Sequence, residues 1–121
     1  MGKTVLIIED NDQNMYLLTY LLEDSGYNVI QAFDGFTGKI SAMEHTPDII
    51  LLDIQLPGMD GYSVARELRS VQELRSVPVI AVTSYAMPGD EEKARESGAT
   101  GYIEKPINTD TFISEIEKFI K

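Results

Sequence analysis

Several features are missing from this chain of 121 residues, and each absence excludes a class of protein. It has no cysteine, which excludes disulfide bridges, thiolate metal sites and cysteine nucleophiles. Basic residues number only 10 against 20 acidic ones, and the resulting charge of −10 disfavours direct contact with DNA or with an anionic membrane. No apolar run is long enough to cross a bilayer, and no signal-peptide pattern is present. We therefore expect a soluble, cytoplasmic protein.

The residues that are present predict one globular domain spanning 1–121. Hydrophobic residues make up 43% of the chain and aromatic residues 8%, which is typical of a folded protein and not of a disordered one. A chain of this length can bury a sizeable core. No stretch has the composition of a linker between domains.

Short apolar segments alternate with amphipathic stretches along the whole chain. The predicted strands are Thr4–Ile8, Asn28–Ala32, Ile49–Asp53, Val79–Thr83 and Gly101–Glu104. Three of them are almost continuously apolar, which is typical of strands covered on both faces of a parallel sheet. The alternation predicts a doubly wound α/β fold with right-handed connections.

The intervening stretches have helical periodicity. In the first predicted helix one face carries Leu17, Leu18, Leu21 and Leu22, and the helix ends at Ser25-Gly26. The fourth, over residues 89–97, begins with three acidic residues that favour a helix N-terminus. The last is expected to follow a cap at Asn108.

Polar residues occupy the carboxyl ends of four predicted strands: Glu9 and Asp10, then Asp53, Thr83 and Lys105. In open α/β sheets ligands bind beyond this edge. Carboxylate oxygens suit Mg²⁺, which often keeps a phosphate among its ligands. A lysine and a hydroxyl would stabilise that phosphoryl group. The sequence therefore predicts a shared site for Mg²⁺ and a phosphoryl group.

Each of these residues also has a plainer interpretation when it is taken alone. Glu9 and Asp10 are acids of a kind favoured at a helix start, and Asp53 could cap a turn. Lys105 could be a solvated surface lysine, and Thr83 an ordinary strand residue. Their joint placement at four strand ends favours the shared site.

Four segments resemble the receiver domain of two-component response regulators. They are "IIEDN" (7–11), "DIILLDIQLPGMDG" (48–61), "VIAVTSYA" (79–86) and "YIEKPI" (102–107), in family order and spacing. The resemblance extends over essentially the whole chain and is greatest to stand-alone regulators of the DivK type. It implies a (βα)5 flavodoxin-like, CheY-like fold, with five parallel strands in the order 2-1-3-4-5 and helices on both faces.

The resemblance also implies a role for each site residue. Asp53 would be the phosphoacceptor, and Mg²⁺, or Mn²⁺ in its place, would be held by Glu9, Asp10, Asp53 and the backbone carbonyl of Gln55. Lys105 would neutralise a phosphoryl oxygen, and Lys105-Pro106 is a candidate cis peptide. Thr83 and Tyr102 would form the switch, in which the hydroxyl moves to the phosphoryl group and the aromatic ring changes rotamer with it.

The function implied is that of a single-domain response regulator without an output domain. It would accept a phosphoryl group from a sensor histidine kinase or a histidine phosphotransfer protein. It would then bind a downstream protein through the surface of its fourth helix, fifth strand and fifth helix, as a monomer or a phosphorylation-dependent dimer. It is not expected to be an enzyme in the ordinary sense.

Other functions stay open at this point. The chain could be the receiver part of a hybrid kinase or of a larger regulator, or a pseudo-receiver that is never phosphorylated. A Mg²⁺-dependent phosphatase with an aspartate nucleophile is disfavoured, because Gln55 stands where such enzymes carry a second aspartate. Finally, Gln55 and Tyr85 either shield the phosphoryl group from water or merely face solvent, and Tyr16 and Tyr20 either dock the kinase or are surface aromatics.

Overall fold

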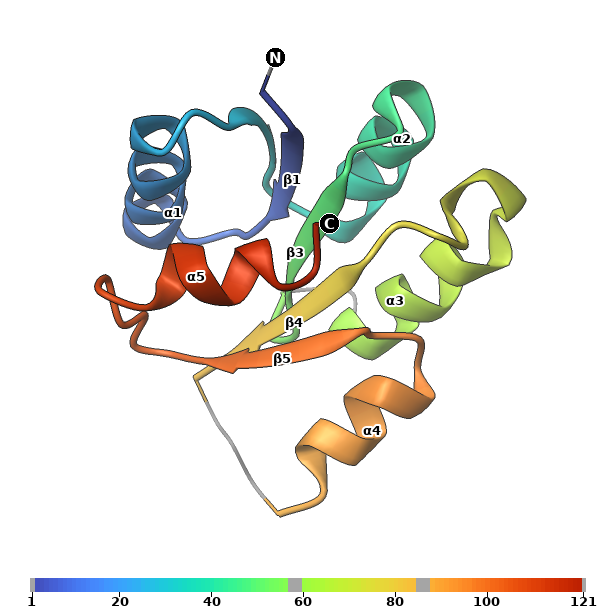
Figure 1. Ribbon diagram of the computed structural model, residues 1–121. Coiled ribbons are helices and arrows are strands. Elements are labelled where there is room, and N and C mark those ends of the chain that lie inside the picture. Colours follow the sequence, from blue (N-terminus) through green and yellow to red (C-terminus); the bar gives the residue numbers. More distant parts are fainter. Residues whose placement is uncertain (1, 57–59, 85–87, 121) are drawn as a thin grey trace.

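The computed structural model describes residues 2–56, 60–84 and 88–120 of the chain. Its centre is a sheet of five parallel strands in the order β2-β1-β3-β4-β5 (Figure 1). The strands are β1 (Thr4–Ile8), β2 (Asn28–Ala32), β3 (Ile49–Asp53), β4 (Val79–Thr83) and β5 (Gly101–Glu104). The predicted fold class, strand bounds and strand order are confirmed.

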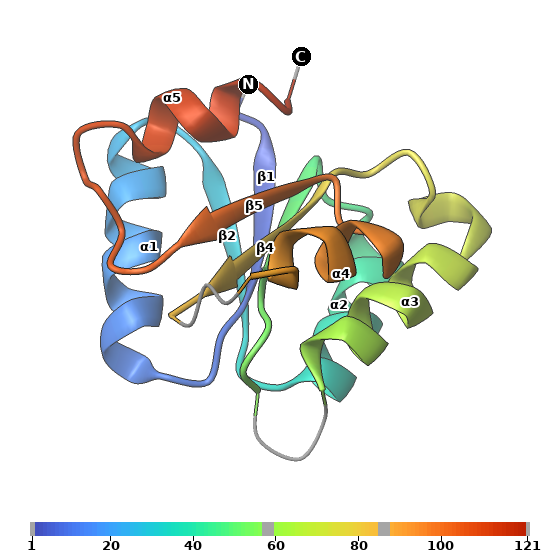
Figure 2. The same ribbon diagram turned by 90° about the horizontal axis from the view of Figure 1, so that it is seen from below.

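Helices cover both faces of this sheet. They are α1 (Asp12–Asp24), α2 (Gly35–His45), α3 (Gly61–Ser70), α4 (Asp90–Glu96) and α5 (Phe112–Glu117), with a short 3₁₀ turn, η1 (Gln72–Leu74). Figure 2 shows α1 and α5 on one face and α2, α3 and α4 on the other. Among the described residues, no helix is long and apolar enough to cross a membrane.

The buried strands contribute side chains to two separate cores, because alternate side chains of a strand point to opposite faces. In β1, Val5 and Ile7 pack with residues of α1 and α5. Leu6 and Ile8 pack instead with residues of α2 and α3. The nearly continuous apolar runs of the sequence therefore reflect burial of the strands on both faces.

Two helix predictions differ from the structure in detail. The buried face of α1 consists of Met15, Leu18 and Leu22, whereas Leu17 and Leu21 are only half-buried. The predicted cap at Asn108 is wrong, since α5 begins at Phe112. The Asn108 side chain instead accepts a hydrogen bond from the amide of Asp110, 3.0 Å away, and so closes a turn before the helix.

Candidate functional site

The residues that follow β1, β3 and β5 are held by backbone hydrogen bonds that continue the sheet. The amide of Glu9 donates to Ala32, at 3.0 Å, and that of Lys105 to Thr83, at 2.7 Å. The amide of Ile54, directly after Asp53, donates to Val82 at 3.0 Å. The sheet therefore fixes the backbone from which the predicted site residues project.

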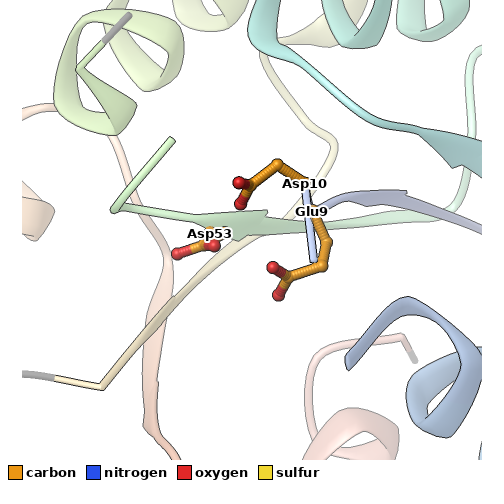
Figure 3. A group of neighbouring side chains, drawn as sticks. All are labelled: Glu9, Asp10 and Asp53. Carbon is orange, nitrogen blue, oxygen red and sulfur yellow. The ribbon is translucent and has the colours of Figure 1, made fainter. Parts of the chain in front are cut away.

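Three carboxylates meet at this edge of the sheet. Glu9, Asp10 and Asp53 each place one oxygen within 4.8 Å of the others, and Figure 3 shows the side chains converging from the ends of β1 and β3. Glu9 is only 1% exposed and Asp53 only 4%, while Asp10 is open to solvent. Buried carboxylates this close repel one another and need positive charge nearby.

Lys105 supplies one such charge. Its Nζ donates to Oε1 of Glu9 at 2.8 Å and lies 3.5 Å from Oδ2 of Asp53. The lysine side chain is itself only 9% exposed, and the Lys105–Pro106 peptide bond is cis. Burial raises the pKa of the Glu9 carboxyl, and the hydrogen bond from Lys105 opposes that rise.

Backbone amides orient the two buried carboxylates. The amide of Gln55 donates to Oδ1 of Asp53 at 2.9 Å, and the amide of Asn11 donates to Oε2 of Glu9 at 3.2 Å. In each carboxylate the other oxygen is the one that lies near Lys105. Asp53 is thus held in a defined orientation, with Oδ2 turned toward the ammonium group of Lys105.

The side chain of Gln55 links two loops of the site. Its Oε1 accepts a hydrogen bond from the amide of Ser84, 3.1 Å away, so it joins the chain after β3 to the chain after β4. The sequence placed Gln55 beside the site but did not predict this bond, because residues 55 and 84 are brought together only by the pairing of β3 and β4. Tyr85 lies outside the described residues.

The two proposed switch residues lie in different surroundings. Thr83 is the last residue of β4 and is buried, at the same edge as the carboxylates. Tyr102 of β5 packs under α4 with Tyr62 and Ala94, and in the described part of the chain its buried hydroxyl has no hydrogen-bond partner. Burial, followed by the negative charge of Asp90, raises the pKa of Tyr102.

The donor set fits a hard divalent cation. Mg²⁺ is bound in proteins by one or two carboxylates together with water and phosphate oxygens, and here three carboxylates approach one another closely. Asp10, the exposed member, faces solvent from which water ligands could come. Histidine and cysteine, which softer metals prefer, are absent from this cluster.

Comparison with protein families agrees with this chemistry. The model of the response regulator receiver domain matches residues 5–117. The chain is 48% identical to the polar-differentiation response regulator DivK of Brucella ovis over 120 residues, which cover 99% of this chain and 98% of that protein. The DivK proteins of Brucella abortus and Brucella suis match equally well.

Solved structures are similar over the whole chain. The receiver domain of the sensor histidine kinase PA1611 from Pseudomonas aeruginosa has a TM-score of 0.91 at 35% identity, covering 99% of this chain and 98% of that one. That structure holds a magnesium ion coordinated in its active-site cleft. The chemotaxis protein CheY4 of Vibrio cholerae has a TM-score of 0.93 at 25% identity, covering 98% of this chain and 99% of that one.

Proposed function

The chain belongs to the response regulator receiver domain family of two-component signalling, and we propose that Asp53 is its phosphoacceptor. The observation that carries the proposal is the setting of Asp53, at the end of β3. Its Oδ1 is held by the amide of Gln55, and its Oδ2 lies 3.5 Å from the ammonium of Lys105. Glu9 is also buried beside an amide donor and Lys105, but of the three clustered carboxylates Asp53 is the one carried by β3, the strand that pairs with β4 and its terminal Thr83.

The chemistry is transfer of a phosphoryl group from a phosphohistidine. An oxygen of Asp53 attacks phosphorus, a P–O bond forms, and the P–N bond breaks with its electron pair going to the imidazole. Charge on the transferring oxygens needs preorganised positive groups. In this proposal Lys105 provides one, and it can shift from the carboxylates toward the phosphoryl group as that group arrives.

Mg²⁺ is the proposed cofactor, with Mn²⁺ as a substitute. Glu9, Asp10 and Asp53 would hold it, Glu9 through a water molecule, together with the backbone carbonyl of Gln55. When bound, the ion would neutralise charge on the carboxylates and on the phosphoryl oxygens. The support from this chain is the convergence of the three carboxylates, two of them nearly inaccessible to solvent.

The proposed switch begins at Thr83. A phosphoryl group on Asp53 would attract the Thr83 hydroxyl, since both residues lie at the same edge of neighbouring strands. Tyr102 would then change rotamer and alter the surface of α4, β5 and α5. Its unpartnered hydroxyl supports this proposal, because the buried rotamer carries a desolvation cost that the other rotamer would relieve.

We further propose that the chain acts as a stand-alone regulator in the cytoplasm. A sensor histidine kinase or a histidine phosphotransfer protein would phosphorylate it, and a downstream protein would bind its α4-β5-α5 surface. The similarity to DivK, which covers 98% of that protein, supports this proposal. The match to the receiver domain of a sensor histidine kinase is the observation that favours the alternative, a receiver that forms part of a larger protein.

Turnover of an external phosphate ester is not part of the proposal. In this structure the amide oxygen of Gln55 accepts a bond from Ser84 and offers no acidic proton two residues beyond Asp53. The chain would therefore catalyse only its own phosphorylation and slow dephosphorylation.

The test is the intact mass of the protein after incubation with acetyl phosphate, with Mg²⁺ or with EDTA. Wild type is expected to gain one phosphoryl group only with Mg²⁺, and Asp53→Asn is expected to gain none. Asp110→Asn, which changes an exposed aspartate outside the carboxylate cluster, is the matched control and should behave as wild type. Labelling of Asp53→Asn as complete as that of wild type would refute the assignment.

A further inference from the structure

The helix α2 has its bulky apolar side chains on the wrong side for a core helix. Its buried residues are small: Gly35, Gly38 and Ala42. The large residues Phe36, Ile40 and Met43 are exposed by 73%, 42% and 54%. The usual pattern, in which the bulky apolar side chains face the sheet, is therefore reversed.

The small residues are required by the close approach of α2 to the sheet. A Cβ added at Gly38 would lie 2.5 Å from Cδ1 and 2.7 Å from Cγ1 of Ile8, which is fully buried in β1. Close packing on this side explains why the buried face lacks large residues, but it does not explain the large residues on the opposite side. Those residues contribute little to the core of this domain.

Phe36, Ile40 and Met43 form a continuous surface feature, here called the α2 apolar stripe. Their spacing of four and three residues places them in one line along the helix. Phe33, which precedes the N-terminus of α2, is a second exposed aromatic residue in this segment, at 44%. Single exposed apolar residues are normal, whereas a contiguous group of this kind indicates an interaction surface.

The charges beside the stripe are predominantly negative. Asp34 and Glu44 are exposed on either side of it along the chain, and the one lysine of α2, Lys39, is paired with Glu67 at 3.2 Å. The amide of Thr37 donates to Asp34 and lowers the pKa of its carboxyl, which keeps Asp34 ionised. A second copy would bring the same acidic rim and a further charge of −10, and an anionic membrane would be repelled in the same way.

We propose that the α2 apolar stripe binds an amphipathic helix of a partner protein whose apolar face is flanked by lysine or arginine. A line of apolar side chains at helical spacing matches the apolar face of one helix, and the acidic rim matches basic flanks. This surface lies beside the β2 edge of the sheet, at the opposite edge from β5. A partner held here would leave the α4-β5-α5 surface free, and its binding would not need phosphorylation of Asp53.

The experiment uses a synthetic amphipathic helix of leucine and lysine with one tryptophan. Because the protein contains no tryptophan, fluorescence of the peptide reports binding directly. Wild type and Asp53→Asn are expected to bind equally, and the variant Phe36→Gln/Ile40→Gln/Met43→Gln at least tenfold more weakly. Tyr16→Gln/Tyr20→Gln, which removes two exposed aromatic residues from α1 on the other face of the sheet, is the matched control and should bind as wild type.

Several results would overturn the proposal. One is that the leucine–lysine peptide binds the α2 variant as tightly as wild type, and another is that it does not bind wild type at all. A third is that a leucine–glutamate helix binds wild type as tightly as the leucine–lysine helix does. Sedimentation that shows a wild-type dimer lost in the α2 variant would make the stripe a self-interface, and binding to phosphatidylglycerol vesicles would make it a membrane surface. Amide chemical shifts of wild type, titrated with the peptide, locate the site without any variant and should move along α2.

Discussion

Replacing Lys105 with methionine is expected to lower the free energy of unfolding by about 3–5 kcal/mol at neutral pH without Mg²⁺, the usual cost of removing one partner from a buried ion pair. At an effective dielectric constant of about 20, the 2.8 Å contact with Glu9 corresponds to about 6 kcal/mol of attraction and the 3.5 Å contact with Asp53 to about 5 kcal/mol. The desolvation of the lysine, which methionine does not suffer, offsets part of this attraction. The net cost is therefore smaller than the sum of these two attractions.

Urea unfolding measures the effect, and Lys39→Met is the matched control. The Lys39–Glu67 pair has a similar contact distance, 3.2 Å, but its side chains are 34% and 43% exposed. Exposed ion pairs contribute about 0–1 kcal/mol, so the same substitution should cost little there. In a Glu9→Gln background, Lys105→Met should cost clearly less than in wild type, because one of the two buried carboxylates is already neutral.

The dependence on pH has a defined sign. Burial already raises the pKa of Glu9 in the folded protein, and Lys105→Met removes the hydrogen bond that opposes the rise. A group with a raised folded pKa binds its proton more tightly when folded, so stability falls as pH rises from the unfolded pKa through the folded pKa. The loss of stability caused by Lys105→Met should therefore be small at pH values below the unfolded pKa of Glu9 and complete at pH values above its folded pKa.

Mg²⁺ provides a second check, since a cation at the three carboxylates would replace the missing ammonium. The deficit of Lys105→Met should therefore shrink when Mg²⁺ saturates the protein. If Lys105→Met is as stable as wild type without Mg²⁺, or if its cost is unchanged in the Glu9→Gln background, the buried ion pairs of Lys105 do not stabilise the fold.

Four further predictions follow from particular contacts. Gly61→Ala should cost about 2 kcal/mol or more in urea unfolding, because its Cβ would lie 2.4 Å from Cα of Ile54 and backbone cannot yield as a side chain can; an unfolding midpoint equal to that of wild type would count against this contact. Arg69→Met should cost about 3 kcal/mol, because its guanidinium binds four backbone carbonyls and one hydroxyl around the loops before β4 and β5, and Arg69→Lys should not restore the loss. Full rescue by lysine would show that charge alone matters there. Tyr102→Phe should raise the free energy of unfolding by about 1 kcal/mol by removing a buried hydroxyl without a partner, and a loss of stability would show that the hydroxyl is satisfied. Gln55→Ala should shorten the lifetime of the phosphorylated protein by opening the site to water and by releasing the amide of Ser84, and an unchanged dephosphorylation rate would mean that this side chain does not shield the phosphoryl group.

The architecture of this protein follows from local patterns in its amino-acid sequence. Apolar runs such as residues 49–52 have no polar face, which favours strands covered on both sides, and their alternation with helical stretches leaves few topologies. The same rules placed Glu9, Asp10, Asp53, Thr83 and Lys105 at one edge of the sheet, because the carboxyl ends of parallel strands lie together. Local rules were weaker at helix ends, where Asn108 closes a turn and does not cap α5.

Contacts between residues distant in the chain follow only from the packing of the folded protein. Lys105 binds Glu9 across 96 positions of sequence, and Gln55 binds Ser84 across 29, and neither bond has a local signal. The orientation of α2 is of the same kind: the glycines that bring it against Ile8 leave Phe36, Ile40 and Met43 facing outward, although residue type alone would place such side chains inside. Periodicity shows which residues share a face, but only packing against the sheet decides which face is buried.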